Sequence, residues 1–115
     1  MNRVSKGELK IVDYLKSKGI ICVSNYSSPN FRINSMQLAF DLGFHLQDRI
    51  FLIEYNGRQW YTENCVNLNN KRNEIKQNLC EKNNYPLLTI KYDVPLSEMK
   101  VMIDNFIADN SKVKL

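Results

Sequence analysis

The chain has 115 residues, enough for one hydrophobic core, and 43% of them are apolar while 24% are charged. This balance excludes a disordered chain, and no apolar run approaches the 18 residues that a membrane-spanning helix needs. The net charge of +4 permits an acidic partner such as nucleic acid but does not require one.

The start of the chain and its cysteines indicate the cytoplasm. The first ten residues, MNRVSKGELK, lack the apolar core of a secretory signal. The three cysteines are odd in number and widely spaced, and with His45 as the single histidine they match no zinc spacing. We therefore predict one cytoplasmic domain over residues 1–115 with reduced thiols and no membrane association.

The first predicted helix begins after Ser5 and ends at Gly19. Ser5 is followed three residues later by Glu8, which is the pattern of a capping box. Glu8 also lies on the side of the helix that carries the apolar stripe, where an acid is unusual. Two interpretations stay open: Glu8 only closes the capping box, or its carboxylate points toward a site on the sheet.

The middle of the chain predicts a short strand over Ile20–Ser24 and a loop over Tyr26–Ser35, which contains Ser-Ser-Pro-Asn. A β-hairpin then follows, with strands over Met36–Leu46 and Arg49–Asn56. Its first strand alternates apolar and polar residues, and its second is rich in Ile, Phe and Leu.

The hairpin predicts a pair of opposed acids. If Gln47–Asp48 is the two-residue loop, Leu46 faces Arg49, and the same register places Asp41 opposite Glu54. Directly opposed side chains share one face of the sheet, with Cβ atoms about 4.5–5.5 Å apart. Two carboxylates this close repel each other unless a proton or a cation lies between them. Hard oxygen ligands from neighbouring strands suit Mg²⁺.

The second half of the chain predicts an exposed loop over Gly57–Asn70, a helix over Asn70–Asn83, a strand over Pro86–Tyr92 and a last helix from Pro95. A strand, a helix and a strand in succession form a crossover unit with parallel pairing. The expected fold is therefore α/β (α+β), with a mixed central sheet flanked by helices.

Two residues of this half have alternative interpretations. Trp60 either stacks on nucleic-acid bases beside Tyr61 or covers the edge of the core. Lys76, which flanks the apolar stripe of its helix, either reaches along the sheet face or is solvated.

Several short motifs in this order resemble the small PD-(D/E)xK nucleases related to very-short-patch repair endonucleases of bacteriophages and mobile elements. The resemblance begins at Gly7-Glu8, continues at Phe40-Asp41 and is sharpest at Ile53-Glu54-Tyr55-Asn56-Gly57-Arg58-Gln59. It ends with Arg72-Asn73-Glu74-Ile75-Lys76 and the strand that follows.

The resemblance implies a restriction-endonuclease-like fold and Mg²⁺- or Mn²⁺-dependent cleavage of DNA phosphodiesters. It implies that Asp41 and Glu54 hold the metal with help from Glu8. Gln59 and Lys76 would complete the catalytic set. Contacts with the DNA backbone would come from the remaining polar and aromatic candidates: Arg49, Arg58, Trp60, Lys71 and Arg72. One such domain can nick, whereas cutting both strands would need a homodimer.

The chain departs from the family pattern at three positions. Asn56 stands where the ExK motif has lysine, Trp60 where relatives have histidine, and Asn73 where they often have aspartate. These changes keep a rival interpretation open, in which the fold binds DNA or a protein partner without cleaving it.

Overall fold

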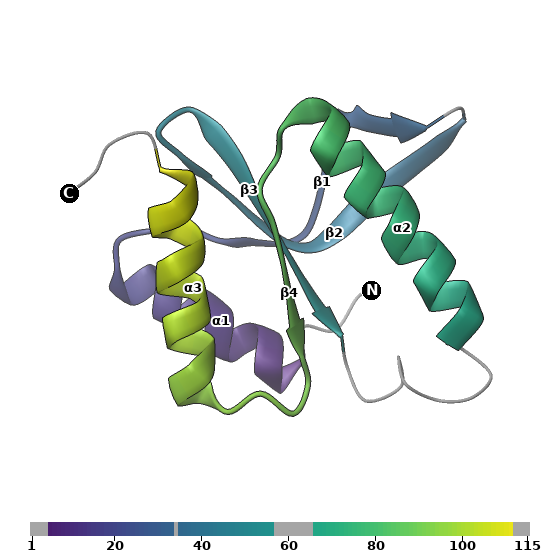
Figure 1. Cartoon of the computed structure of the whole chain (residues 1–115). Coiled ribbons are helices and arrows are strands. Elements are labelled where there is room, and N and C mark those ends of the chain that lie inside the picture. Colours follow the sequence, from purple (N-terminus) through teal and green to yellow (C-terminus); the bar gives the residue numbers. More distant parts are fainter. Residues whose placement is uncertain (1–4, 34, 57–65, 112–115) are drawn as a thin grey trace.

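A computed structural model describes residues 5–33, 35–56 and 66–111 of the chain (Figure 1). These residues form three helices and a four-stranded sheet in the predicted order of helix, three strands, helix, strand and helix. The elements are α1 (Lys6–Ser17), β1 (Val23–Ile33), β2 (Met36–Leu46), β3 (Arg49–Asn56), α2 (Val66–Asn83), β4 (Leu87–Lys91) and α3 (Leu96–Asn110).

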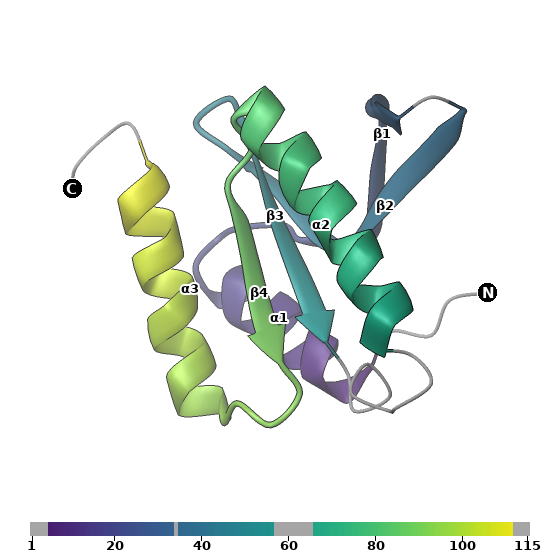
Figure 2. The same ribbon diagram turned by 45° about the vertical axis from the view of Figure 1, so that its right-hand side comes forward.

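The sheet has the strand order β1-β2-β3-β4 and is mixed. β1 and β2 are antiparallel, as are β2 and β3, whereas β3 and β4 are parallel. Helix α2 makes the crossover between the two parallel strands and covers one face of the sheet, while α1 and α3 cover the other (Figure 2). The predicted α+β fold with a mixed sheet between helices is confirmed.

The two faces of the sheet bury separate hydrophobic clusters. On the α1 and α3 side, Leu42, Phe44 and Ile53 from the sheet pack with Ile11 of α1 and Ile103 of α3. Phe44 and Phe51 are stacked with ring centroids 5.1 Å apart. A smaller cluster lies under α2 and consists of Phe31, Leu38, Phe40, Leu52, Leu79 and Cys80. Helix α2 is therefore held through its C-terminal half.

The predicted hairpin register is confirmed. The ladder between β2 and β3 runs from Leu46↔Arg49 to Leu42↔Ile53. Gln47 and Asp48 have φ angles of 53° and 62°, which is the left-handed pair that a type I′ turn requires. This turn matches the twist of the strands and fixes the register although neither residue is glycine.

The predicted loop over Tyr26–Ser35 is wrong, because β1 extends from Val23 to Ile33 and pairs with β2. Pro29 is tolerated there because β1 is an edge strand, where a missing backbone donor costs no ladder bond. Between Ser27 and Arg32 the register shifts: β1 advances by five residues while β2 advances by two. The three extra residues of β1 form an irregularity of the bulge type.

The side chain of Gln37 on β2 fixes this irregularity. Its amide nitrogen donates hydrogen bonds to Ser27 Oγ at 2.8 Å and to the carbonyl oxygen of Ser28 at 2.5 Å. The Ser27 hydroxyl in turn donates to the carbonyl of Leu38 at 2.7 Å. Arg32, which follows the irregularity, is thereby placed opposite Gln37.

The helix predictions hold with one correction. Ser5 and Glu8 form the predicted capping box at the start of α1. Helix α2 begins at Val66 rather than Asn70, so the predicted loop before it is shorter than expected. Residues 57–65 of that loop lie outside the described residues. In the described part of the chain, no helix is both long and apolar enough to cross a membrane.

Candidate functional site

Asp41 and Glu54 lie together where β2 and β3 separate. The ladder between these strands ends at Leu42↔Ile53, one pair before the two acids. Asp41 Oδ2 accepts a 2.8 Å hydrogen bond from the backbone N–H of Tyr55, beyond the last ladder pair. The carboxylate therefore takes a strand N–H donor and is fixed beside Glu54.

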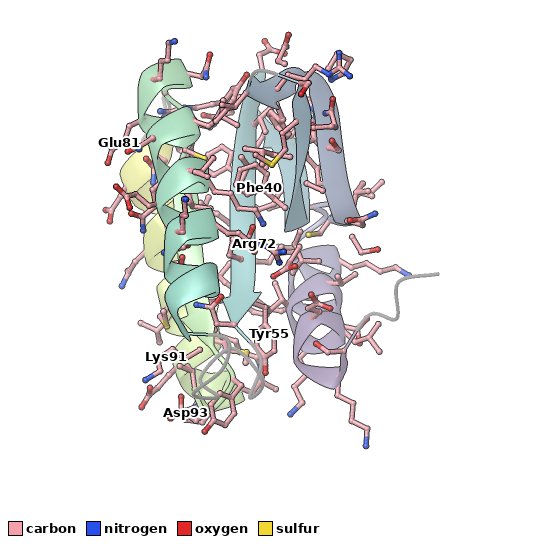
Figure 3. The ribbon with its side chains drawn as sticks, turned by 90° about the vertical axis from the view of Figure 1, so that its right-hand side faces the viewer. Phe40, Tyr55, Arg72, Glu81, Lys91 and Asp93 are labelled. Carbon is pink, nitrogen blue, oxygen red and sulfur yellow. The ribbon has the colours of Figure 1, made fainter. Side chains whose placement is uncertain are left out.

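The two acids line one cavity of about 210 Å³ between β2, the end of β3 and the middle of α2. The other lining residues are Tyr55, Asn56, Arg72, Asn73 and Lys76. In the view of Figure 3, Arg72 of α2 appears between Phe40 of β2 and Tyr55 of β3. The structure thus brings together Asp41, Glu54 and Lys76, as predicted, and adds Arg72 from the predicted DNA contacts.

Glu54 is the buried member of the acid pair, with 6% of its surface exposed. Burial raises its pKa to about 8, and the negative charge of Asp41 and a hydrogen bond with Asp41 act in the same direction. The charge of Lys76 opposes this increase without cancelling it. Near neutral pH Glu54 therefore holds a proton that a cation can replace.

Lys76 reaches along the sheet face, which is the first of its two predicted alternatives. Its Nζ lies 2.6 Å from Glu54 Oε1 and 5.3 Å from the centroid of the Phe40 ring. About a fifth of the Lys76 side chain is exposed. Phe40 was not predicted as a site residue, because the sequence shows it only as a core aromatic of β2. Its contact with Lys76 depends on how α2 crosses the sheet.

Glu8 follows the capping-box alternative. Its carboxylate accepts a 2.9 Å hydrogen bond from the backbone N–H of Ser5, and Glu8 does not line the acid-pair cavity. Burial and the charge of Asp41 raise the pKa of Glu8, while the hydrogen bonds with Ser5 lower it. Glu8 is thus close enough to Asp41 to feel its charge, but the described residues bring no three His, Cys, Asp or Glu side chains together as metal ligands.

Arg49 lies at the opposite end of β3, five residues or roughly 16 Å along the strand from Glu54. Its guanidinium donates hydrogen bonds to the carbonyl oxygens of Asn110 at 2.7 Å and Asn84 at 3.2 Å. These carbonyls lie at the C-terminal ends of α3 and α2. Arg49 therefore joins two helix ends and is not part of the acid-pair cavity.

The remaining predicted residues differ in what the structure describes. Lys71 is exposed on α2 and does not line the cavity. Arg58, Gln59 and Trp60 lie outside the described residues. Burial raises the pKa of the Cys22 and Cys80 thiols to about 11, so neither is a ready nucleophile.

The donor set suits Mg²⁺ or Mn²⁺. Asp41 and Glu54 supply hard carboxylate oxygens from neighbouring strands, and the Asn56 side chain, 8% exposed, lines the same cavity. Magnesium sites in proteins commonly use one or two carboxylates and complete the shell with water and substrate phosphate. Two neighbouring acids therefore match the protein contribution that such sites use.

The chain was also compared with known proteins. A scan against protein-family models found no match, and searches for similar curated proteins and for similar solved structures found none.

Proposed function

We propose that this protein is a metal-dependent DNA endonuclease of the PD-(D/E)xK type, which hydrolyses phosphodiester bonds with Mg²⁺ or Mn²⁺. The observation that carries the proposal is that Asp41 and the buried Glu54 line one cavity, with Lys76 Nζ 2.6 Å from Glu54 Oε1.

This arrangement is costly for folding, which is why it supports a functional site. A buried carboxylate with a pKa of about 8 beside a second acid lowers stability at neutral and higher pH. Strongly shifted pKa values of this kind gather at sites that bind ions or perform catalysis. An apolar residue in place of Glu54 would fill the same space without this cost.

The chemistry follows from the charges that line the cavity. A divalent cation held by Asp41 and Glu54 would act as a Lewis acid and lower the pKa of a water molecule. The Lys76 ammonium, released from Glu54, would then stabilise the negative charge that develops on the scissile phosphate. Arg72 would bind a neighbouring phosphate, and the amides of Asn56 and Asn73 can orient water or substrate.

The sequence motifs support the same activity. The strand Ile53-Glu54-Tyr55-Asn56 resembles the signature of the very-short-patch repair group, and Lys76 resembles the helix-borne lysine of some of its branches. In this proposal Lys76 on α2 takes the part of the strand lysine that Asn56 replaces. Gln59 remains a predicted water-orienting residue.

A second candidate function is binding of DNA or of a protein partner without cleavage. The 2.6 Å contact between Lys76 Nζ and Glu54 Oε1 favours it, because a lysine already occupies the carboxyl oxygen that a metal would need. Asn56 in place of the strand lysine favours it too.

The decisive experiment is a plasmid-nicking assay with Mg²⁺ or Mn²⁺ on the wild type and on Glu54→Gln, which keeps the shape of the side chain. The matched control is Glu98→Gln, which removes an exposed acid from α3. We expect nicking by the wild type and the control but not by Glu54→Gln. Equal absence of nicking in all three proteins would reject the nuclease, and DNA binding without nicking would favour the second candidate.

A further inference from the structure

A second cavity lies beside the C-terminal half of α2, next to the hairpin of β1 and β2. Its volume is about 430 Å³, and it is lined by Asn30, Arg32, Ile33, Asn78, Leu79, Lys82 and Asn83. Two of these side chains are cationic, three are asparagines and none is acidic. We call this the far cavity. Its cations and amides suit the phosphates and base edges of a nucleic acid better than they suit an apolar ligand.

The two cations of the far cavity come from different elements and converge on it. Arg32 comes from β1, directly after the irregularity that Gln37 fixes, and Lys82 comes from the last turns of α2. Both are exposed, and neither forms an ion pair with another residue of the segments that the structure describes. Their charges are therefore available to a ligand.

The asparagines add directional groups. Asn78 and Asn30 are exposed at the cavity, and Asn83 donates its amide N–H to the carbonyl of Leu79 at 2.9 Å, which fixes the orientation of its side chain. Amides of this kind can both donate to phosphate oxygens and contact base edges.

The far cavity and the acid-pair cavity share one helix. Lys76 lines the first and Asn83 the second, on the same side of the helix seven residues later, which is about 10 Å along the axis of α2. At about 3.4 Å of rise per nucleotide in one strand, this separation corresponds to two or three nucleotides. A DNA strand whose scissile phosphate lies at the acid pair can therefore place a later phosphate at the far cavity.

We infer that the far cavity is a second backbone subsite, in which Arg32 and Lys82 bind a phosphate of the DNA strand two or three nucleotides from the acid pair. This inference deepens the proposed function, because it takes the DNA substrate from it. It gives the irregularity in β1 a purpose, since the three extra residues place Arg32 opposite Gln37, where it meets Lys82 at one cavity.

The test measures binding of a fluorescein-labelled single-stranded DNA decamer by fluorescence polarisation in EDTA, over a range of salt concentrations. The variant is Arg32→Gln with Lys82→Gln, and the matched control is Lys10→Gln with Lys16→Gln, two exposed lysines of α1 on the other side of the sheet. Each lost phosphate contact reduces the slope of log K against log salt by about 0.7 for a single strand. We expect a decrease of about 0.7–1.4 in the variant and no change in the control.

A second variant, Asn78→Asp, introduces a negative charge into the far cavity without removing a cation. We expect it to weaken decamer binding several-fold, and circular dichroism checks that all variants are folded. Unchanged slopes in the double variant, or no decamer binding by the wild type, would overturn the inference. A poly-glutamate peptide that binds equally well, with the same dependence on Arg32 and Lys82, would assign the far cavity to an acidic protein and overturn it too.

These outcomes are separable from those of the nicking assay, because EDTA prevents cleavage. Nicking by the wild type with unchanged slopes would remove the far-cavity inference alone. The expected slopes without any nicking would remove the nuclease chemistry and leave the subsite in place.

Discussion

The backbone N–H of Tyr55 donates a 2.8 Å hydrogen bond to Asp41 Oδ2. Tyr55, the residue directly after Glu54, thereby fixes the Asp41 carboxylate beside Glu54. Asp41 thus has a structural partner in addition to its proposed role as a metal ligand. Substitutions at this position can separate the two roles.

Asp41→Asn keeps an oxygen that accepts from Tyr55, whereas Asp41→Ala removes it. We expect Asp41→Ala to lower the free energy of unfolding by about 1–2 kcal/mol more than Asp41→Asn does, because a hydrogen bond to a charged group is lost. Urea denaturation in EDTA measures this difference. Both variants should lose Mn²⁺ binding in calorimetry, and an Asn variant that still binds Mn²⁺ would show that Asp41 is not a ligand.

The raised pKa of Glu54 predicts how stability depends on pH. The folded protein holds the Glu54 proton up to about pH 8, while the unfolded chain releases it near 4.5. Between these values the folded state binds more protons, so the free energy of unfolding decreases as pH rises, by at most about 1.4 kcal/mol per pH unit. Below pH 4.5 the contribution of Glu54 is complete, and above pH 8 it is lost.

Thermal unfolding in EDTA from pH 5 to pH 9 tests this dependence. Glu54→Gln should flatten the profile between pH 5 and pH 8, and Glu98→Gln should leave it unchanged. A wild-type profile parallel to that of Glu54→Gln would show that Glu54 does not hold a proton in the folded state.

Metal binding should strengthen with pH because the cation replaces the proton of Glu54. Below a pKa of about 8, the apparent affinity for Mn²⁺ should rise up to tenfold per pH unit. Calorimetric titrations at pH 6 and pH 7 in two buffers of different ionisation enthalpy would show the release of about one proton. Equal affinities at both pH values would mean that a group other than Glu54 binds the cation.

The substitution Lys76→Met distinguishes the proposed nuclease from a module that binds without cleavage. If Lys76 stabilises the developing charge, we expect the nicking rate to fall roughly 10²–10³-fold. Mn²⁺ affinity should stay the same or increase, because the competing ammonium is gone from Glu54. Lys16→Met on α1 is the control and should keep its rate. A Lys76→Met protein with normal nicking would limit Lys76 to charge compensation.

At Gly7 we expect alanine to have the opposite of its usual effect on the stability of a helix. Alanine normally stabilises a helical glycine position by about 0.5–1 kcal/mol. Here a Cβ on Gly7 would overlap the ring of Tyr55, so Gly7→Ala should destabilise the protein. In a Tyr55→Ala background the same substitution should become neutral or stabilising, and a double-mutant cycle by urea denaturation measures this change. Additive effects would show that the two residues do not meet.

The hairpin and its acid pair could be predicted from sequence because their signals are local. Period-2 alternation and a two-residue loop determine which residues face each other, and Asp41 and Glu54 follow from that register. The separation of the strands at this point could not be predicted, because the hydrogen bond from Tyr55 to Asp41 depends on side-chain geometry.

The sequence misses the extent of β1, the start of α2 and the contact between Phe40 and Lys76, each for a physical reason. Ser-Ser-Pro-Asn in β1 is typical of a turn, but pairing with β2 overrides this local preference at the edge of the sheet. The first residues of α2 are rich in asparagine and have no apolar period, so the sequence predicts the start of this helix four residues too late. The contact between Phe40 and Lys76 joins residues 36 positions apart, and single-sequence patterns do not show how a helix crosses a sheet.

The side chain of Arg49 joins the two helix ends that lie beside the hairpin turn. It binds the carbonyl of Asn84, directly after α2, and that of Asn110, the last residue of α3, and so holds the helices on the two faces of the sheet together beside the hairpin turn. A disturbance of the hairpin turn would therefore shift both helix ends together.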